Sequence, residues 1–407
     1  MAKFGFSNQG QALIGILIVL VTVVVIIGGL YYSFQAQTPK ILKVIEESVK
    51  REVTTPSAEE KPPETEGKII PEGISEKPEE KTHSIQVPVL VLKYFPTPDE
   101  IITIGGTIAE KRAGINLITN QLVSTLEEGS IYHGYKDPTA TPSFDYSIVE
   151  TKEFLEAVPL SSQFPERGDK FLMFSDPTIG VADICTNYID NPNVEVREVW
   201  IWMYHIENTM LGDLFIPKTG PTESNMAMGT ISQPYWNKDT YGDVSNSARV
   251  KDLPVCAKTY TVYEYNYTRG LAEALENHGH QLESVFAYAD SSLFWSKFVG
   301  PTKNQPGLRR CGNAHNPPNA EFEYDRGNTT NFIETDCEDW KPDASGQTQI
   351  INCNTWRCTT PGYFVWWMQN MPGKNNNLTY QGKLLRNWWN FIGDFDQAVQ
   401  KGRSLTY

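Results

Sequence analysis

The sequence has too few positive charges to suit a nucleic-acid-binding protein. Its 407 residues contain 35 Lys and Arg against 49 Asp and Glu, which gives a formal net charge of -14. Because phosphate binding needs a basic face, this balance argues against nucleic acid as a partner. The chain also lacks a Gly-rich phosphate loop, a dinucleotide-binding fingerprint and a nucleophile elbow. These absences argue against NTPases, dehydrogenases and serine hydrolases.

Charged residues are absent from residues 12–32, "ALIGILIVLVTVVVIIGGLYY". At about 1.5 Å per helical residue, this segment is long enough to cross a hydrocarbon core of ~30 Å. Tyr31 and Tyr32 would then lie at the membrane interface. The apolar run is longer than that of a cleavable signal peptide, and no clear small-residue cleavage site accompanies it. We therefore predict an uncleaved, single-pass anchor in the cytoplasmic membrane.

The start of this segment, "NQGQALIGILIVL", resembles the signal segments of pilin-like proteins. Those segments are processed after a glycine and have a glutamate five residues later. Here Gly15 or Gly10 stands at that position, depending on which glycine is taken as the processing site. A simple signal anchor is therefore favoured over assembly into a pilus.

The flanking charges and the cysteines give opposite indications of orientation. Lys3 precedes the apolar segment, whereas four basic residues follow it between positions 40 and 51. By the positive-inside rule, this local count favours a cytoplasmic location for the rest of the chain. However, six cysteines are present, and four of them lie in an irregular C-terminal region that needs cross-links for order. We therefore expect the bulk of the protein to be extracytoplasmic.

Composition divides the chain into four segments. Residues 1–37 contain the signal anchor and the transmembrane helix. Residues 38–53 have an apolar residue every four positions, which predicts a short amphipathic stalk helix. Residues 54–86 are rich in Glu, Lys and Pro and contain no aromatic residue, so we expect a disordered spacer. Residues 87–407 form the predicted head.

The head is predicted to have an α/β fold, with a mostly parallel sheet and helices on both faces. Strand-like and helix-like segments alternate along it, as is typical of parallel sheets. The strand-like segments are "VPVLVLKYFP", "FDYSIVETKEF", "EVREVWIWMYH" and "KTYTVYEYNY". The helix-like segments are "TIAEKRAGINLITNQLVSTLEEG", "DPTIGVADICTNYID" and "GLAEALENHGHQLESVF". After Asp290 the pattern gives way to irregular sequence rich in Cys and Trp.

The cysteine spacing favours disulfides over a zinc module, because paired C-x-x-C elements are missing. Cys353 and Cys358 are close enough in sequence to close a small loop. At least one disulfide is expected among these two, Cys311 and Cys337. Cys185 lies in an apolar helical stretch and is predicted to be a free buried thiol.

Two histidines lie two residues apart in the helix-like segment that begins at Gly270. At about 100° per residue, His278 falls on the same face as the leucines and is expected in the core. His280 falls on the opposite face, between Glu276 and Glu283 at spacings of four and three. Such a group can bind a divalent metal or act as a base, but it is equally common on a solvated helix face.

Further candidate ligands follow predicted strands or lie in constrained loops. His205 ends the strand-like "EVWIWMYH", and Glu223 lies in the long segment after it. His315 lies in "CGNAHNPPN", a loop restrained by Cys311 and two prolines. Functional groups in open α/β sheets gather where strands end and helices begin, so His205, His280 and His315 are candidates for convergence. Three histidines and a carboxylate would suit zinc with an open water position.

Four sequence blocks together resemble an uncharacterised family of bacterial secreted or surface proteins. The blocks are "YNYTRGLAEALENHGHQLES", "CGNAHNPPNAEFEYD", "DCEDW" and "NWWNFIGDFD", and the resemblance extends from about Val196 onward. The residues that match the recurring positions of the family are Glu223, Arg269, Glu273, His280, Glu283, Cys311, His315 and Asp325. The family pattern has a Trp where this sequence has Arg326. The resemblance supports the choice of site residues and implies no particular reaction.

Two classes of function are compatible with these patterns. The first is a metal-dependent hydrolase of a peptide or a glycan, with Glu276 or Glu283 as general base. The full set of candidate site residues is Glu276, Glu283, Glu223 and Arg269 for catalysis, and His205, His280 and His315 for the metal.

The second class is a non-catalytic carbohydrate-binding or adhesion module on the cell surface. It would use the aromatic faces of two Trp pairs as a ligand platform, although such pairs more often belong to a core. These residues are Trp366, Trp367, Trp388 and Trp389. The sequence indicates neither a substrate nor an oligomeric state.

Overall fold

The computed structural model describes residues 84–95, 105–155, 184–203, 209–211, 214–216, 227–230, 256–302, 305 and 307–407. All of them belong to the compact unit Glu76–Tyr407. The predicted anchor and stalk, and nearly all of the predicted spacer, lie outside the described residues. Within the described ranges, no helix combines the length and the apolar character that crossing a membrane requires.

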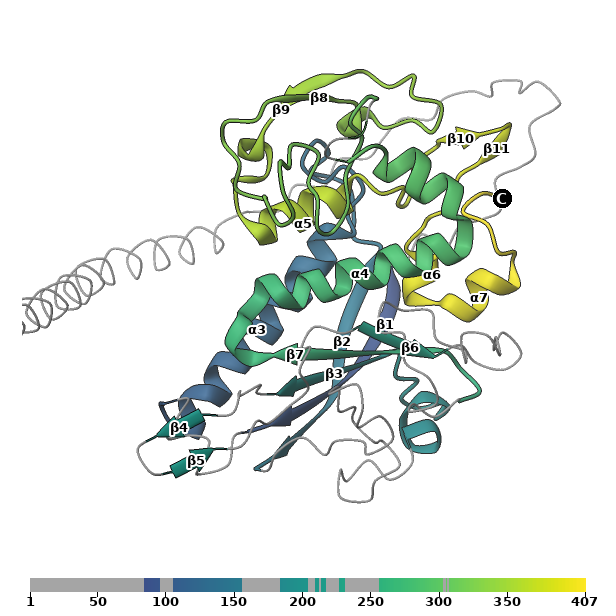
Figure 1. Cartoon of the computed structure of the whole chain (residues 1–407). Helices are drawn as coiled ribbons and strands as arrows, with labels where there is room; N and C mark the ends of the chain where they lie inside the picture. The colour runs from purple at the N-terminus through teal and green to yellow at the C-terminus, as the bar shows by residue number, and fades with distance from the viewer. Residues whose placement is uncertain are drawn as a thin grey trace, which may run out of the picture. The chain divides into compact units, whose positions relative to one another are not determined.

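A five-stranded sheet, with the order β2-β1-β3-β7-β6, underlies the head (Figure 1). Its strands are β1 (Ile85–Tyr94), β2 (Phe144–Phe154), β3 (Glu198–Met203), β6 (Ala227–Thr230) and β7 (Tyr260–Asn266). Neighbours among β2, β1, β3 and β7 run parallel, whereas β6 pairs antiparallel with β7. The predicted α/β fold with a mostly parallel sheet is confirmed. Every residue of β3 is buried, as expected for a parallel strand that is covered on both faces.

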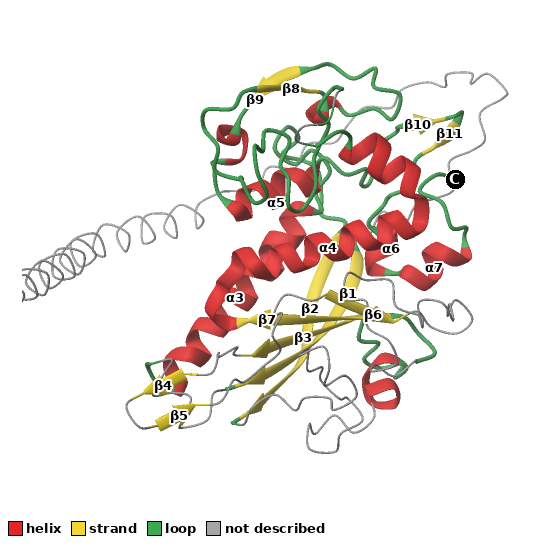
Figure 2. Ribbon diagram, in the orientation of Figure 1, coloured by secondary structure: helices red, strands yellow, loops and turns green. Residues whose placement is uncertain are grey.

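Two long helices pack on one face of the sheet. They are α3 (Ile108–Gly129) and α4 (Gly270–Ser291), each 22 residues long. At the start of α3, Thr107 and Glu110 form a reciprocal capping box, which satisfies backbone N–H groups of the first turn. Figure 2 shows α4 between the sheet and the irregular C-terminal region, so both sides of this helix have neighbours.

Alternating side chains of the strands contribute to two hydrophobic cores. Val87, Val89 and Val91 of β1 join the core beneath α3 and α4. The intervening Leu90 and Leu92 join the core on the other face of the sheet. Among the described residues, the π-helical turn η3 (Cys185–Ile189) packs against that second core. The alternation follows directly from the two-residue period of a strand.

The remaining elements are short. They are β4 (Thr209–Leu211), β5 (Leu214–Ile216), η4 (Tyr267–Arg269), η5 (Ser292–Val299), β8 (Ile333–Thr335), η6 (Cys337–Asp339), β9 (Gln349–Ile351), η7 (Cys353–Trp356), α5 (Thr360–Gln369), β10 (Thr379–Tyr380), β11 (Lys383–Leu384), α6 (Asn390–Gly393) and α7 (Phe395–Gln400). Aromatic packing gives the irregular C-terminal region a core, because Trp366, Trp367, Trp388 and Trp389 are at most 4% exposed.

All six cysteines form disulfides. The pairs are Cys185–Cys256, Cys311–Cys337 and Cys353–Cys358. The predicted small loop between Cys353 and Cys358 is confirmed. The prediction of a free thiol at Cys185 is wrong, because the chain returns after 71 residues and places Cys256 beside it. A contact over such a separation leaves no local pattern in the sequence.

Candidate metal centre

His278 faces the sheet side of α4 and is 3% exposed. Its ring stacks on that of Tyr263, with a centroid distance of 3.8 Å, and its Nε2 lies 2.7 Å from the Tyr265 hydroxyl. Burial lowers the pKa of His278 to about 3, so the ring is neutral at physiological pH. The predicted core position is confirmed.

His280 faces the other side of α4. Its Nδ1 lies 2.9 Å from Oε2 of Glu283, and its Nε2 lies 3.7 Å from Oε1 of Glu276. Both carboxylates are buried, because the loop after Cys311 covers this part of the helix. This face of α4 is therefore not a solvated helix surface. It carries a cluster of polar side chains that the loop covers.

The covering loop adds His315 to the cluster. Nε2 of His315 lies 3.5 Å from Oε1 of Glu276, and the rings of His280 and His315 are nearly perpendicular with centroids 4.6 Å apart. One ligand atom from each of Glu276, His280 and His315 lies within 4.8 Å of the other two. These three side chains could hold a metal ion. The predicted convergence of His280 with His315 is confirmed, whereas His205 and Glu223 lie outside the described residues.

Glu283 holds the helix and the loop together. Its Oε1 accepts a hydrogen bond of 2.7 Å from the backbone N–H of Ala314, while its Oε2 contacts Nδ1 of His280. This contact orients the His280 ring so that its Nε2 faces Glu276. Metal-binding histidines commonly have their second ring nitrogen fixed by a carboxylate in this way.

Gly279, between the two histidines, allows the C-terminal region to approach α4. A Cβ atom at this position would lie 2.7 Å from the Phe364 ring and 3.3 Å from Cβ of Ala314. A larger residue would therefore push away the loop that carries His315. The three residues of "HGH" thus have different roles on one helical turn. His278 belongs to the core, Gly279 allows the C-terminal region to pack closely, and His280 belongs to the polar cluster.

Arg326 is a buried member of the site that the sequence patterns did not identify. Its Nη2 lies 3.1 Å from Oε2 of Glu276 and also donates to the carbonyl oxygen of Ala314. Its guanidinium group lies over the Phe364 ring, 4.8 Å from the centroid. Arg326 therefore fixes Oε2 of Glu276, while Oε1 of the same carboxylate faces His280 and His315. The only sequence signal at this position was its departure from the family pattern.

The charges of the cluster shift two pKa values in opposite directions. Burial alone would raise the pKa of Glu276, but hydrogen bonds from His280 and His315 and the charge of Arg326 hold it well below its usual range. Burial alone would lower the pKa of His280, but hydrogen bonds to Glu276 and Glu283 raise it to about 9. A metal that binds His280 at neutral pH must therefore displace a proton.

Arg269, a candidate for catalysis, lies at the start of α4. It forms an ion pair of 2.9 Å with Glu273, one helical turn further on. A catalytic role for Arg269 stays a prediction.

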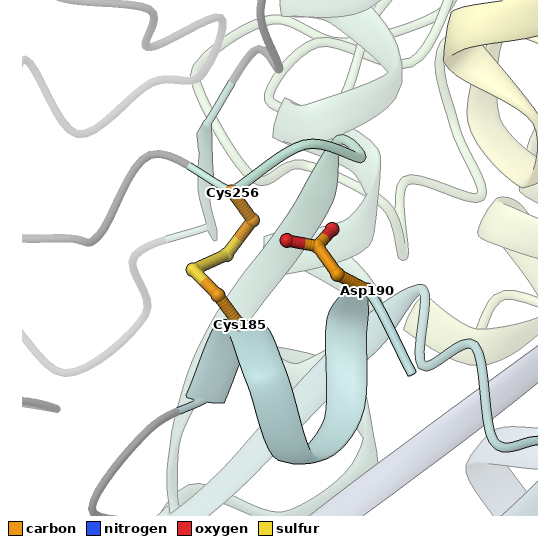
Figure 3. A group of neighbouring side chains, drawn as sticks. All are labelled: Cys185, Asp190 and Cys256. Carbon is orange, nitrogen blue, oxygen red and sulfur yellow. A yellow bond between two sulfur atoms is a disulfide. The ribbon is translucent and has the colours of Figure 1, made fainter. Parts of the chain in front are cut away.

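A second group of potential ligands consists of Cys185, Asp190 and Cys256 (Figure 3). The two sulfur atoms are bonded to each other, so neither is a free thiolate ligand. The carboxylate of Asp190 accepts hydrogen bonds of 2.9 Å from the backbone N–H groups of Ala257 and Lys258. This group therefore fixes the chain before β7 to the turn η3.

Comparison with known proteins provides no family for this chain. The sequence matches no protein-family model, and no curated protein or solved structure has significant similarity to it. The resemblance to an uncharacterised bacterial family stays a prediction. Functional conclusions therefore depend on the geometry of the cluster around His280.

Proposed function

We propose that the head is a metal-dependent hydrolase whose metal is held by Glu276, His280 and His315. The convergence of these three side chains carries the proposal. Two histidines and one glutamate are a ligand set of catalytic zinc sites, which keep a fourth position open. Tetrahedral bonds of about 2.0–2.1 Å require donor atoms roughly 3.3 Å apart. The distances from Oε1 of Glu276 to the two histidine nitrogens, 3.7 and 3.5 Å, are close to this value.

The surrounding residues support this assignment of roles. Arg326 orients Glu276, and Glu283 orients His280. Both oxygens of Glu283 already have partners, and the pKa of Glu276 is held low, so a ligand role for Glu276 and a positioning role for Glu283 suit them better than that of general base. A divalent metal bound here would supply a Lewis acid that activates water and polarises the bond to be cleaved.

The proposed location is outside the cytoplasmic membrane, with residues 12–32 as the anchor. Three disulfides in the head support an oxidising compartment. Protease added to intact spheroplasts should release the head by cleavage within residues 54–84. Protection of the head together with a cytoplasmic control protein would place it inside.

The alternative of a carbohydrate-binding module loses its predicted ligand platform. The two Trp pairs are buried and pack against other aromatic rings. Trp388, for example, contacts Phe286 and Trp340. These faces cannot stack on a sugar without disruption of the core.

Hydrolysis can be tested with zinc-loaded full-length protein in detergent. Panels of quenched peptides and of glycan polymers cover both substrate classes that the proposal allows. Cleavage should require zinc, stop with a chelator and be absent in His280→Ala. If the protein binds zinc through these residues but cleaves neither class, the hydrolase proposal is contradicted and a binding role takes its place.

A further inference from the structure

Tyr324 lies at the solvent-exposed edge of the metal-ligand group. Its hydroxyl oxygen is 3.1 Å from Nε2 of His315, the nitrogen that also faces Glu276. The Tyr324 and His315 rings have centroids 4.6 Å apart. Tyr324 is 50% exposed, so it lies beside the cluster without being part of the core.

The backbone of Tyr324 is held in an unusual conformation. Its φ of 66° lies in the left-handed region, which residues with a side chain rarely adopt. The N–H of Tyr324 donates to the carbonyl oxygen of His315, and its own carbonyl accepts from the N–H of Arg326, both at 2.7 Å. Such a conformation persists only where the surrounding structure imposes it. The same two residues that contact Glu276 therefore fix the position of Tyr324.

Metal binding would change the contact between Tyr324 and His315. A metal bound to Nε2 of His315 would occupy the lone pair of this nitrogen, which could then neither donate to nor accept from the Tyr324 hydroxyl. The hydroxyl oxygen, no longer hydrogen-bonded to this nitrogen, would be available to coordinate the same metal. Its distance of 3.1 Å from Nε2 also suits the roughly 3.3 Å between neighbouring donors of a tetrahedral site.

We propose that Tyr324 is the fourth protein ligand of the metal centre, bound through its phenolic oxygen. The inference rests on the proposed metal site. On binding, the O–H bond breaks, its electron pair stays on the oxygen that coordinates the metal, and the proton goes to solvent. Because the ring is half exposed, little packing energy opposes its displacement. The centre is thus closed at rest, and a substrate gains access when it displaces Tyr324.

Copper substitution tests this ligand directly. Cu²⁺ bound by a phenolate oxygen gives a charge-transfer absorption in the visible region, whereas histidine and carboxylate ligands alone do not. Copper-loaded full-length wild type should show this band, and Tyr324→Phe should lack it while it still binds copper. Tyr324→Phe should also weaken zinc binding by about 10-fold or more, on the scale of changes to metal-site partners.

Tyr135→Phe is the matched control, because Tyr135 is also partly exposed and its hydroxyl is hydrogen-bonded, in this case to Asn370. It should retain the band and the zinc affinity. If the wild type binds copper through His280 but shows no band, the Tyr324 ligand is overturned and the three-residue metal site stands. If the wild type binds neither copper nor zinc, both the metal site and this inference are overturned.

Discussion

The two sides of α4 each carry a histidine, and the two histidines have different surroundings. On the sheet side, His278 is a neutral ring among aromatic side chains, with a pKa lowered by burial to about 3. On the loop side, His280 lies between two carboxylates that raise its pKa to about 9. The backbone separates the two residues by a single glycine. Their chemistry therefore depends on the side chains around each ring. These are aromatic rings of the sheet at His278, and two carboxylates of α4 itself, buried under the loop, at His280.

The covers of the two faces also differ in construction. The sheet covers His278 through regular hydrogen-bonded strands. The loop over His280 is held in place by the Cys311–Cys337 disulfide, by the N–H of Ala314 that donates to Glu283, and by the buried Arg326 that pairs with Glu276. An irregular loop can place several polar groups around one point, but it depends on cross-links for its order. The proposed metal centre lies on the loop side, so zinc binding should depend on the disulfide of that side.

Replacement of both members of a disulfide by Ser tests this difference with the largest expected effects. Loop-closure entropy gives a loss of about 4.4 kcal/mol for Cys185–Cys256 and about 3.5 kcal/mol for Cys311–Cys337, whose loops span 71 and 26 residues. Only the Cys311–Cys337 change should also weaken zinc binding, because it releases the loop that carries His315. Urea unfolding and zinc titration measure the two effects. Equal loss of zinc affinity in both variants would show that the loop has no special role.

The sheet side should have its own pH dependence through Glu198. This buried carboxyl accepts hydrogen bonds from Trp200 and Tyr146, yet burial raises its pKa to about 7 from 4.5. The folded state then holds a proton that the unfolded state has lost, so stability falls as pH rises from 4.5 through 7. Relative to wild type, Glu198→Gln should gain about 3 kcal/mol across this window. Chemical unfolding at several pH values measures the difference, and a constant difference would contradict the raised pKa.

Glu283→Gln should weaken zinc binding by about 10- to 100-fold, because the carboxylate orients His280 without being a ligand itself. Glu273→Gln is the control on the same helix, since Glu273 pairs with Arg269 outside the group. Its zinc affinity should equal that of wild type. Isothermal titration of both variants decides between a positioning role and a purely structural one for Glu283.

The smallest expected effect is a difference in pH dependence between two histidine variants of chelator-treated protein. The quantity compared is the loss of folding stability in His280→Ala and in His278→Ala. Protonated His280 stabilises the fold fully below pH 6.5, and this contribution is lost as pH rises through about 9. The cost of His280→Ala should therefore shrink between pH 7 and 10. His278 is neutral in both states over this range, so His278→Ala should cost a constant amount of about 2 kcal/mol from its cavity and the unpaired Tyr265 hydroxyl. A parallel pH dependence of the two costs would be contrary to these assignments.

The regular half of the head could be predicted from sequence because its periodicities are local. The buried valines and leucines of β1 and the inward face of α4 with His278 follow from repeats of two and 3.6 residues. The neighbours of His280 on its own helix follow from the same geometry.

Arg326, Tyr324 and the disulfide partner of Cys185 could not be predicted, because they reach their contacts through segments without a regular sequence pattern. Arg326 and Tyr324 reach the cluster from a loop without periodicity, and the Cys185–Cys256 bond joins segments 71 residues apart. His315 is indicated by its restrained loop and by the family resemblance, and by no periodicity. Long-range contacts of this kind leave no spacing rule in a single sequence.

The zinc content of purified full-length protein decides whether a metal centre exists at Glu276, His280 and His315. The protein would be saturated with zinc, freed of excess ion and measured by elemental analysis, together with His280→Ala and Glu273→Gln. One zinc per chain is expected in the wild type and in Glu273→Gln, and none in His280→Ala. Absence of zinc from the wild type, or equal zinc in His280→Ala, would contradict a metal centre at Glu276, His280 and His315.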